Sequence, residues 1–357
     1  MKKRIGILTS GGDCPGLNAC IRGVARASYQ LFDAEFIGIS DGFRGLIDGD
    51  YRVMQPDDFS EILTLGGTIL GTSRQPYRNM RVIENNLDKV AAMKKNYKEM
   101  KLDCLLTLGG NGTHKTANLL AQEGLHVIGL PKTIDNDIYG TDVTFGFHSA
   151  VDIATDVIDR IHTTANSHGR VMVIELMGNK AGWLTLYAGV SGGADVILIP
   201  EIPYTIDSLI RAVEERAKKK KRKFAIIAVA EGAMTTEEAK LKGKKRAAVR
   251  AEETYMSVSY RIADQIQQAT GIESRVVVPG HYQRGGSPSP YDRLLSTRFG
   301  EYAARLILEE KYGRTVAMKG DVITDNRLCE VAGKTKFVSP GNQLVSTAKN
   351  VGISFGD

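Results

Sequence analysis

Hydrophobic residues along the chain fall into short, β-branched runs separated by longer amphipathic stretches. The runs are RIGILT (4–9), EFIGIS (35–40), DCLLTL (103–108), HVIGL (126–130), RVMVIEL (170–176), DVILIP (195–200), FAIIAVA (224–230) and SRVVVP (274–279). Because most of these runs are apolar throughout rather than alternating, they predict strands that are buried on both faces. Such strands are typical of parallel sheets covered by helices.

Helices are predicted in the stretches between these strands. The expected ranges are 15–31, 81–99, 113–123, 147–166, 206–221 and 252–270. Strands alternating with helices predict an α/β fold with mainly parallel sheets. The chain has 357 residues, which is long for one core and suits two domains. No linker stands out, so we expect the domains to be docked or interwoven.

Polar, glycine-rich loops follow many of the predicted strands. In chain order they are SGGDCPG, GGNGT, PKTIDND, MGNKAG, EGA and GHYQRGG. In open parallel sheets, ligands bind beyond the carboxyl ends of the strands. The sequence therefore predicts an active-site cleft built from these loops.

Two of the loops place glycines directly before a predicted helix. Gly11 and Gly12 follow the first strand, and Gly110 and Gly112 follow the DCLLTL run. Glycines let an anion approach the backbone, and a helix N-terminus supplies free N–H groups. A tight turn explains either loop alone equally well, but two such loops in one sheet favour a nucleotide or polyphosphate. Neither loop matches the dinucleotide-binding or Walker pattern, so a dehydrogenase is poorly supported.

The PKTIDND loop concentrates charge, with Lys132 shortly before Asp135 and Asp137. Phosphoryl transfer to a hydroxyl needs a base near that hydroxyl and positive charge on the transferred group. Two carboxylates separated by one residue can divide the work, one accepting the proton while the other holds metal or orients a partner. A capping role in a turn is the alternative for either acid.

Arg74 ends a separate glycine-rich loop, GGTILGTSR (66–74), where an arginine could neutralise phosphate charge. Cationic side chains near strand ends form a further set, namely Arg170, Arg275, His281 and Arg284. Each alone can be an ordinary surface residue. Together they predict a pocket for phosphate groups, since arginine grips a phosphomonoester bidentately. Glu231, directly after an apolar strand, is a candidate acceptor for sugar hydroxyls.

The composition narrows the class of partners. The net charge is +6, which suits acidic partners including phosphorylated metabolites. The one dense basic run, at 218–223, is interpreted as a solvated helix end rather than a nucleic-acid site, because no binding motif accompanies it. No stretch reaches the roughly 20 apolar residues of a membrane span. The cysteines, Cys14, Cys20, Cys104 and Cys329, form no CxxC pair, which favours a reduced, cytoplasmic protein.

Five segments together resemble the 6-phosphofructokinase family in order and spacing. They are GILTSGGDCPGLNACIRG, GGNGT, PKTIDND, RVMVIELMG and GHYQRGGSPSPYDR. The resemblance runs from about residue 4 to 312, and the tail is less diagnostic. It implies two interlocked three-layer α/β domains, with the active site in a cleft at the strand C-terminal ends. Residues 1–146 plus about 266–312 would bind nucleotide, and 147–265 plus about 313–357 would bind sugar phosphate.

The resemblance implies transfer of a phosphoryl group from MgATP to the 1-hydroxyl of fructose 6-phosphate. Asp135 would be the base, Thr133 would contact the reacting end, and Asp137 with Asn111 would serve magnesium. The nucleotide side would comprise Gly11, Gly12, Arg74, Gln75, Gly110, Asn111, Gly112 and Thr113. The sugar-phosphate side would comprise Thr133, Asp135, Arg170, Met177, Gly178, Asn179, Glu231, Arg275, His281 and Arg284. Arg170 and Arg275 would reach a neighbouring subunit's site, which implies a homotetramer, or at least a dimer.

Two positions depart from the family pattern. Asn111 stands where members commonly have a magnesium-binding Asp, and Asn179 stands where many have Arg. On this comparison Asn111→Asp should raise activity or lower the magnesium requirement. The departures leave open a weakly active paralogue that only binds its ligands, although the intact TIDND segment argues against it.

The phosphoryl donor rests on two conflicting positions. In the family, Gly at the position of Gly112 goes with ATP, because Asp there fills space and repels phosphate. Lys at the position of Lys132 is common among pyrophosphate users. We weight Gly112 more and expect ATP, with a pyrophosphate-dependent enzyme as the alternative. The sequence also leaves open sedoheptulose 7-phosphate as an acceptor, and an effector role for Arg22 and Arg26.

Overall fold

The computed structural model describes residues 2–84, 86–220, 224–252 and 254–357. The chain forms two compact units, each built from two chain segments. Unit 1 comprises Met1–Ser149 and Arg284–Lys336, and unit 2 comprises Ala150–Gln283 and Phe337–Asp357. The chain therefore passes from one unit to the other three times.

Unit 1 is organised around a mainly parallel sheet. Its strands are β1 (Lys3–Ser10), β2 (Ala34–Ile39), β3 (Tyr51–Met54), β4 (Cys104–Gly109), β5 (Val127–Pro131), β10 (Arg314–Lys319) and β11 (Val322–Arg327). In the described residues, the sheet order is β11-β10-β5-β4-β1-β2-β3. The central pairs are parallel, and the two outermost pairs are antiparallel.

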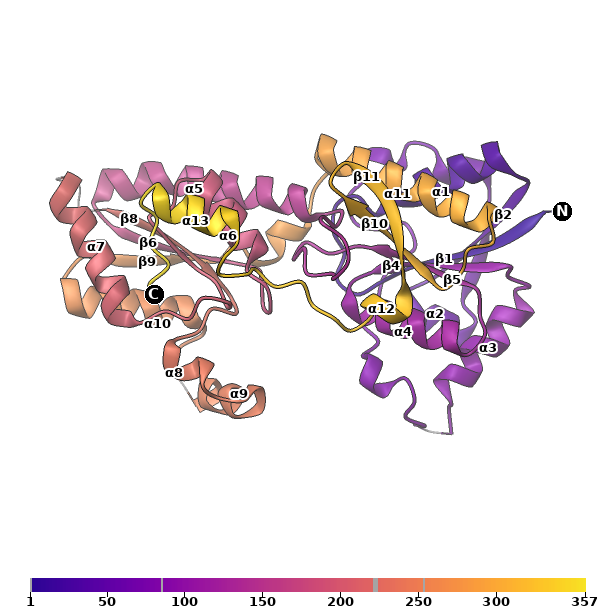
Figure 1. The fold of residues 1–357 in the computed structure, drawn as a ribbon, viewed down its shortest axis with the longest axis horizontal. Coiled ribbons are helices and arrows are strands. Elements are labelled where there is room, and N and C mark those ends of the chain that lie inside the picture. Colours follow the sequence, from indigo (N-terminus) through magenta and orange to yellow (C-terminus); the bar gives the residue numbers. More distant parts are fainter. Residues whose placement is uncertain (1, 85, 221–223, 253) are drawn as a thin grey trace. The chain divides into compact units, whose positions relative to one another are not determined.

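Helices cover both faces of this sheet (Figure 1). They are α1 (Leu17–Leu31), α2 (Phe43–Asp48), α3 (Lys89–Glu99), α4 (Asn111–Gln122), α11 (Pro290–Leu308) and α12 (Leu328–Val331), with short 3-10 turns at Pro56–Phe59, Ile62–Thr64 and Tyr77–Asn79. α1 and α11 pack together on one face, and α2, α3 and α4 lie on the other. The two helices approach closely enough to require glycine at their contact. A Cβ atom at Gly300 of α11 would lie 2.5 Å from the backbone nitrogen of Val24 in α1.

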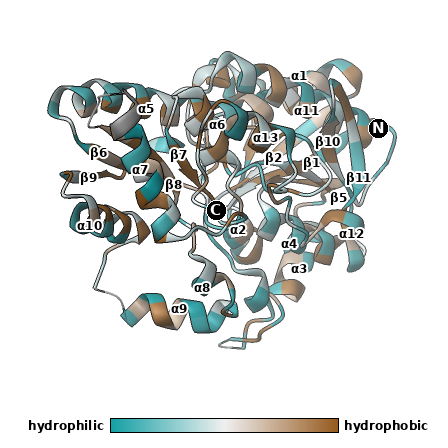
Figure 2. Ribbon diagram, turned by 60° about the vertical axis from the view of Figure 1, so that its left-hand side comes forward, coloured by the Kyte–Doolittle hydropathy of each residue, from teal (hydrophilic) through white to brown (hydrophobic). Residues whose placement is uncertain are grey.

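Unit 2 has a smaller, fully parallel sheet. Its strands are β6 (Val171–Leu176), β7 (Val196–Leu198), β8 (Ala225–Ala230) and β9 (Ser274–Val277), in the order β7-β8-β6-β9. Its helices are α5 (Phe147–His168), α6 (Trp183–Ser191), α7 (Ile206–Lys220), α8 (Thr236–Ala239), α9 (Gly243–Glu252), α10 (Val258–Thr270) and α13 (Gln343–Asn350). α7 and α10 cover one face, where Leu209, Val213 and Ile262 join the buried core. In Figure 2 the strands of the sheet are largely hydrophobic in colour, while α7 carries hydrophilic residues along its length.

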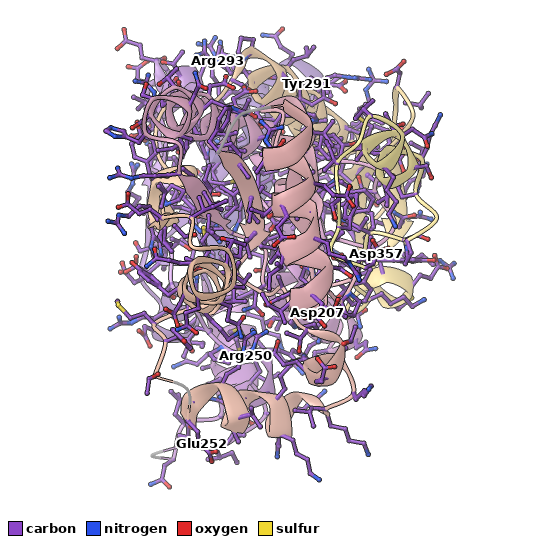
Figure 3. All side chains as sticks on the ribbon, turned by 90° about the vertical axis from the view of Figure 1, so that its left-hand side faces the viewer. Asp207, Arg250, Glu252, Tyr291, Arg293 and Asp357 are labelled. Carbon is purple, nitrogen blue, oxygen red and sulfur yellow. The ribbon has the colours of Figure 1, made fainter. Side chains whose placement is uncertain are left out.

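The excursion formed by α8 and α9 is held by an ionic network. Arg250, labelled in Figure 3, donates from α9 to Glu238 at 2.7 Å and to the Ala233 carbonyl at 2.6 Å. Arg261 of α10 donates to the same carboxylate at 3.0 Å. Burial opposes the charged form of Glu238, but these hydrogen bonds prevail and lower its pKa to about 2. The network explains how α9, which has no buried residue of its own, stays attached.

The α/β class and the two-domain arrangement with mainly parallel sheets are confirmed. One predicted helix, 81–99, is wrong in its first half, because the helix begins at Lys89. The Asp88 carboxylate accepts from the Val90 and Ala91 amides and caps the helix there. The helix predicted at 252–270 likewise begins only at Val258. The basic run at 218–223 falls partly on residues 221–223, which lie outside the described residues.

The unit boundaries differ from the predicted domain boundaries. Residues 266–283 lie in unit 2, because β9 pairs with β6. Residues 313–336 lie in unit 1, because β10 pairs with β5 and β11 with β10. The hydrophobic pattern did not predict this hairpin, because its second strand is largely polar and half-buried. In the part of the chain that the structure describes, no helix is both long and apolar enough to span a bilayer.

Candidate active site

Three neighbouring strands of unit 1 end in the predicted loops. β5, β4 and β1 are adjacent and parallel, so the loops after Pro131, Gly109 and Ser10 emerge side by side at one edge of the sheet. The structure thus brings together the three loops that the sequence singled out in this half of the chain.

The loop after β1 depends on glycine geometry. Gly11 has φ of 87°, a left-handed conformation that side chains disfavour. Its amide donates to the Ser73 carbonyl at 3.1 Å, and its carbonyl accepts from the Thr72 hydroxyl at 2.7 Å. A side chain at Gly12 would lie 2.9 Å from the Arg284 guanidinium. Thr72 and Ser73 are thereby attached to Gly11. Arg74, which is exposed, and Gln75 directly follow them in the chain.

The loop after β4 opens helix α4. Gly110 precedes the helix and offers no side-chain cap, so the first N–H groups of α4 are suited to an anion. A side chain added at Gly112 would meet nothing within 4 Å. The Thr113 hydroxyl is turned inward toward the Ser10 carbonyl, at 3.4 Å. Gly112 therefore leaves open space in front of the helix N-terminus.

The Asn111 amide binds the chain segment that follows α12. Its Nδ2 donates to the Lys334 carbonyl at 2.8 Å and to the Thr335 hydroxyl at 3.3 Å. Its Oδ1 accepts from the Gly333 amide at 3.0 Å. Both ends of the amide thus hold protein backbone, which is a role that the sequence did not predict. Among the described residues, no group of three His, Cys, Asp or Glu side chains forms a metal cluster.

The PKTIDND loop is pinned by short-range bonds. The Thr133 hydroxyl accepts from the Asp135 amide at 3.1 Å and lies 3.4 Å from the Asp135 carboxylate. Asn136, between the two acids, is buried with φ of 50°. The Asp137 carbonyl accepts from the Lys336 amide at 2.8 Å. The two acids are therefore separated by a residue whose backbone conformation is constrained.

Asp135 lies in a cationic environment. Burial raises the pKa of Asp135, and Arg284, Lys132, the Thr133 hydroxyl and Arg74 act in the opposite direction. Lys132 is 3% exposed and its ammonium donates to the Gly12 carbonyl. Burial lowers the pKa of Lys132. A basic carboxylate surrounded by cations suits proton abstraction next to a transferring phosphoryl group.

Arg284, which the sequence analysis placed on the sugar-phosphate side, lies against the loop that follows β1 in unit 1. One guanidinium nitrogen donates to the Asp13 carbonyl at 3.1 Å. Its Nε is buried and has no hydrogen-bond partner among the described residues. A buried guanidinium N–H without a partner, next to Gly12, is suited to bind an oxyanion of a ligand.

In unit 2, the loops after β6 and β8 pack on each other. These strands are neighbours, and Gly178 accepts from the Gly232 amide at 3.3 Å. A side chain at Gly232 would lie 2.0 Å from the Asn179 carbonyl. Met177 and Glu231 begin the two loops, and Asn179 is exposed. The structure therefore gathers these four predicted residues at the carboxyl edge of the unit 2 sheet.

The GHYQR turn is attached to the same edge. It forms a 3-10 helix, η4 (Gly280–Arg284), and His281 is exposed on it. Gln283 is fully buried, and its side-chain oxygen accepts from the Met177 amide at 3.2 Å. The sequence reading missed Gln283, because a glutamine in a polar loop gives no signal of burial.

Arg170 and Arg275 lie at the opposite edge of that sheet. Arg170 precedes β6 and Arg275 is the second residue of β9, so both stand at the amino ends of strands. Both guanidinium groups bind the carboxylate of Glu273, Arg170 at 2.7 Å. Within one chain, unit 2 therefore does not bring these arginines to Met177 and Glu231.

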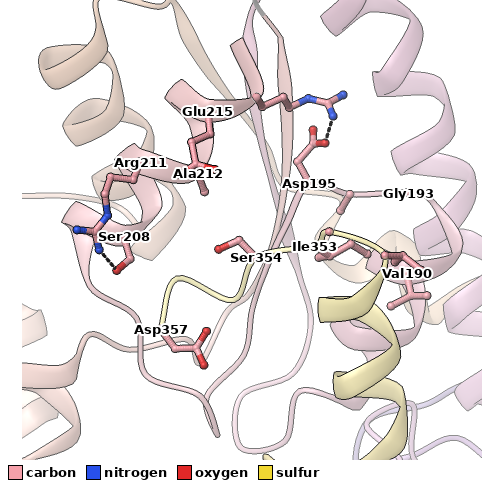
Figure 4. A pocket seen from close by; sticks show the side chains of 14 residues that line it. Val190, Gly193, Asp195, Ser208, Arg211, Ala212, Glu215, Ile353, Ser354 and Asp357 are labelled. Atoms are coloured by element: carbon pink, nitrogen blue, oxygen red, sulfur yellow. Dashed lines mark hydrogen bonds and ion pairs between the residues drawn. The ribbon is translucent and has the colours of Figure 1, made fainter. Parts of the chain in front are cut away.

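A cavity of about 690 Å³ lies in unit 2 beside α7 and the C-terminal segment (Figure 4). It sits near Asp195, which directly precedes β7, and so opens at the amino edge of the sheet. Its charged groups are engaged: Arg216 pairs with Asp195, and Arg211 donates to Ser208 at 2.9 Å. The described lining includes none of the predicted site residues.

Comparison with known proteins identifies the family of the chain. The family model for phosphofructokinase matches residues 4–307. The chain is 56% identical to the ATP-dependent 6-phosphofructokinase of Spirochaeta thermophila, over 99% of this chain and 98% of that protein. It is 51% identical to ATP-dependent 6-phosphofructokinase 3 of Bacteroides thetaiotaomicron, over 99% of this chain and all of that protein. It is also 45% identical to the pyrophosphate–fructose 6-phosphate 1-phosphotransferase of Amycolatopsis methanolica, over 94% of this chain and 96% of that protein.

A solved structure shows the same fold. The crystal structure of Pichia pastoris phosphofructokinase in the T-state superposes with a TM-score of 0.81 at 30% identity. The match covers 99% of this chain and 37% of the longer yeast chain. From the matched family model and the full-length relatives, we conclude that the chain belongs to the phosphofructokinase family.

Proposed function

We propose that the protein transfers a phosphoryl group from ATP to the 1-hydroxyl of fructose 6-phosphate, giving fructose 1,6-bisphosphate and ADP. The observation that carries the proposal is the half-buried Asp135 within a cluster of cations beside two glycine loops. The full-length relatives named as ATP-dependent 6-phosphofructokinases support the same reaction. The protein is therefore a phosphotransferase of glycolysis, and we propose a cytoplasmic location.

Proton abstraction is assigned to Asp135. The carboxylate accepts the proton of the 1-hydroxyl as the oxygen attacks the terminal phosphorus, and the donor's bridging oxygen leaves with ADP. Thr133 lies against this carboxylate and orients it. Burial makes Asp135 a stronger base than an exposed aspartate.

Charge on the transferring group is balanced by Arg284 and Lys132. Arg284 offers its unpaired buried Nε, and the Lys132 ammonium binds the Gly12 carbonyl beside it. The uncapped start of α4 and the Gly11–Gly12 backbone are proposed to hold the donor phosphates. Arg74, Gln75, Gly110 and Thr113 complete the proposed nucleotide side.

Asp137 would hold magnesium together with the donor phosphates, a mode that Mg²⁺ commonly adopts. When bound, Mg²⁺ would neutralise charge that develops between the phosphates. Asn111 contributes less than the sequence suggested, because its amide already binds residues 333–335.

The sugar phosphate is assigned to the unit 2 loops, through Met177, Gly178, Asn179, Glu231 and His281. Arg170 and Arg275 are proposed to complete the site of a neighbouring subunit, since they stand at the opposite edge of their own sheet. Glu273 forms ion pairs with both guanidinium groups at that edge. We therefore propose a homo-oligomer, a tetramer by preference and a dimer at minimum.

Pyrophosphate is the second candidate donor, favoured by Lys132 and by the Amycolatopsis relative. The open space at Gly112 favours ATP, because it leaves room for the rest of the nucleotide. The test is formation of fructose 1,6-bisphosphate from fructose 6-phosphate and magnesium, with ATP and pyrophosphate in parallel. Turnover with ATP alone supports the proposal, and turnover with pyrophosphate alone overturns the donor. A folded protein that binds fructose 6-phosphate but is silent with both donors would be a binding paralogue.

A further inference from the structure

Residues 333–336, which we call the strap, end the second segment of unit 1 and bind two of its loops. Asn111, from the loop after β4, holds the Gly333 amide and the Lys334 carbonyl. Lys336 holds the loop that contains Asp135 and Asp137. Thr335 pairs with Ile138 in an antiparallel bridge. The tail, which is less diagnostic of the family, is thus joined to the proposed site.

The Lys336 ammonium is a three-way anchor. It donates to the Asn136 side-chain oxygen at 3.0 Å, to the Thr141 carbonyl at 3.0 Å and to the Asp142 carbonyl at 2.8 Å. An ammonium has three N–H donors, and these three acceptors all belong to the segment 136–142. The Lys336 amide donates in addition to the Asp137 carbonyl. One residue therefore binds the loop from both its backbone and its side chain.

Asn136 is the element that Lys336 controls. Its backbone is left-handed, a conformation that asparagine adopts more readily than other residues with a side chain when that side chain is hydrogen-bonded. Its side-chain oxygen accepts from the Lys336 ammonium and, at 3.1 Å, from the Thr144 amide. The Thr144 hydroxyl donates to the Thr133 carbonyl at 2.7 Å. The conformation of Asn136 sets the directions in which the flanking acids leave the backbone.

We propose that Lys336 is a positioning residue for phosphoryl transfer, holding Asn136 so that Asp135 and Asp137 keep their relative orientation. This inference rests on the proposed function for its kinetic readout. Lys336 acts through Asn136 and the 141–142 carbonyls and is assigned no contact with the reacting atoms. Loss of its anchor should misdirect the acids while leaving the substrate loops in place.

The strap continues into a second anchor in unit 2. The Val338 amide donates to Glu201 at 2.9 Å, and Glu201 also accepts from the Gly182 amide at the start of α6. Gly182 closely follows the Met177–Asn179 loop in the chain. The same stretch of chain thus binds, within each unit, an element next to a proposed substrate loop.

The test compares Lys336→Met with Lys336→Arg, and uses Lys334→Met as the matched control. Lys334 is exposed in the same segment, and its side chain lies over the Tyr139 ring at 5.3 Å. The control removes one positive charge from the strap while its backbone carbonyl still accepts from Asn111. Steady-state kinetics with ATP and fructose 6-phosphate, and hydrogen exchange of the amides in 133–144, are measured on the full chain.

For Lys336→Met we expect kcat to fall about 10–100-fold, since a small misplacement of reacting groups costs that much. Both KM values should change less than about threefold. Exchange of the 133–144 amides should accelerate, while the β6 and β8 amides keep their protection. Lys336→Arg keeps a charged donor and should therefore be less impaired. Its loss in log kcat should be at most about two thirds of the loss in Lys336→Met. Lys334→Met should retain wild-type kinetics.

Wild-type kcat in Lys336→Met would overturn the proposal, as would an equal loss in Lys334→Met or unchanged exchange in 133–144. An inactive wild-type protein would instead contradict the proposed function. In that case the hydrogen-exchange measurement would still decide whether Lys336 orders the 133–144 loop. A loss confined to KM would also overturn the proposal, because it would place Lys336 in substrate binding.

Discussion

Replacing Asn111 with Asp separates two interpretations of one side chain. The family resemblance predicts a gain, because an added carboxylate would serve magnesium. The structure predicts a loss, because Asn111→Asp turns the Nδ2 donor into an acceptor facing the Lys334 carbonyl, 2.8 Å away. The Gly333 amide keeps its acceptor oxygen, which becomes part of a charged carboxylate.

The expected cost is set by what the Lys334 carbonyl loses. A buried acceptor left without its donor costs about 1–3 kcal/mol. Lys334 is exposed, so water replaces part of the bond and the lower end applies. A loss of about 1 kcal/mol lowers the melting temperature of a domain of this size by roughly 2–4 °C. The strap would loosen, and kcat should fall with it.

The assay is thermal unfolding of Asn111→Asp, combined with the magnesium dependence of turnover at saturating ATP and fructose 6-phosphate. Asn111→Ala removes the hydrogen bonds without adding charge, and Asn350→Asp adds the same charge at an exposed position in unit 2. We expect both Asn111 variants to melt below wild type, and no decrease in the magnesium concentration needed for half-maximal rate. An unchanged melting temperature with a lower magnesium requirement would refute the structural interpretation and restore the metal-ligand one.

Three further predictions concern the base, the donor and acid stability. Asp135→Asn should cut kcat by about 10²–10⁴-fold while fructose 6-phosphate still binds by calorimetry; near-normal turnover would remove Asp135 as the base. Gly112→Asp should leave the melting temperature unchanged, because the added side chain meets open space, yet raise the KM for ATP far more than Gly112→Ala does; equal effects of the two variants would contradict the donor argument. Burial lowers the pKa of His114 to about 4, against about 6.5 in the unfolded chain. The stabilisation from keeping this buried imidazole neutral is therefore fully present above pH 6.5. As pH falls from 6.5 toward 4, the free energy of unfolding decreases by about 3 kcal/mol. His114→Gln should flatten the denaturant midpoint between those pH values, and an unchanged slope would show that His114 is not the group that titrates.

The hydrophobic pattern predicted the interior of the fold better than its margins. All-apolar runs such as DCLLTL and FAIIAVA became central parallel strands, because burial on both faces leaves a clear signal. The β10–β11 hairpin gave no such signal, since one side of it is the edge of the sheet. Cys14, Cys20 and Cys104 are buried, while Cys329 is exposed.

The site was predicted in its loops but not in its long-range contacts. Order and spacing identified GGNGT and PKTIDND, because glycines and paired acids are local features. The partners of Asn111 and Asn136 lie about 200 residues further along the chain, and nothing local to Lys336 indicates what it binds. Arg284 is a similar case, since its bond to the Asp13 carbonyl joins it to a loop near the start of the chain.

The division of each unit between two chain segments has a consequence for synthesis. α11 packs against α1, and β10 extends the sheet beside β5, yet both leave the ribosome only after the whole of 150–283. The first 149 residues therefore emerge with the face of α1 that α11 covers, and the free side of β5, exposed to the cell. Chaperone engagement of the nascent chain should peak before residue 308 is made, and a fragment that stops at residue 149 should aggregate rather than fold.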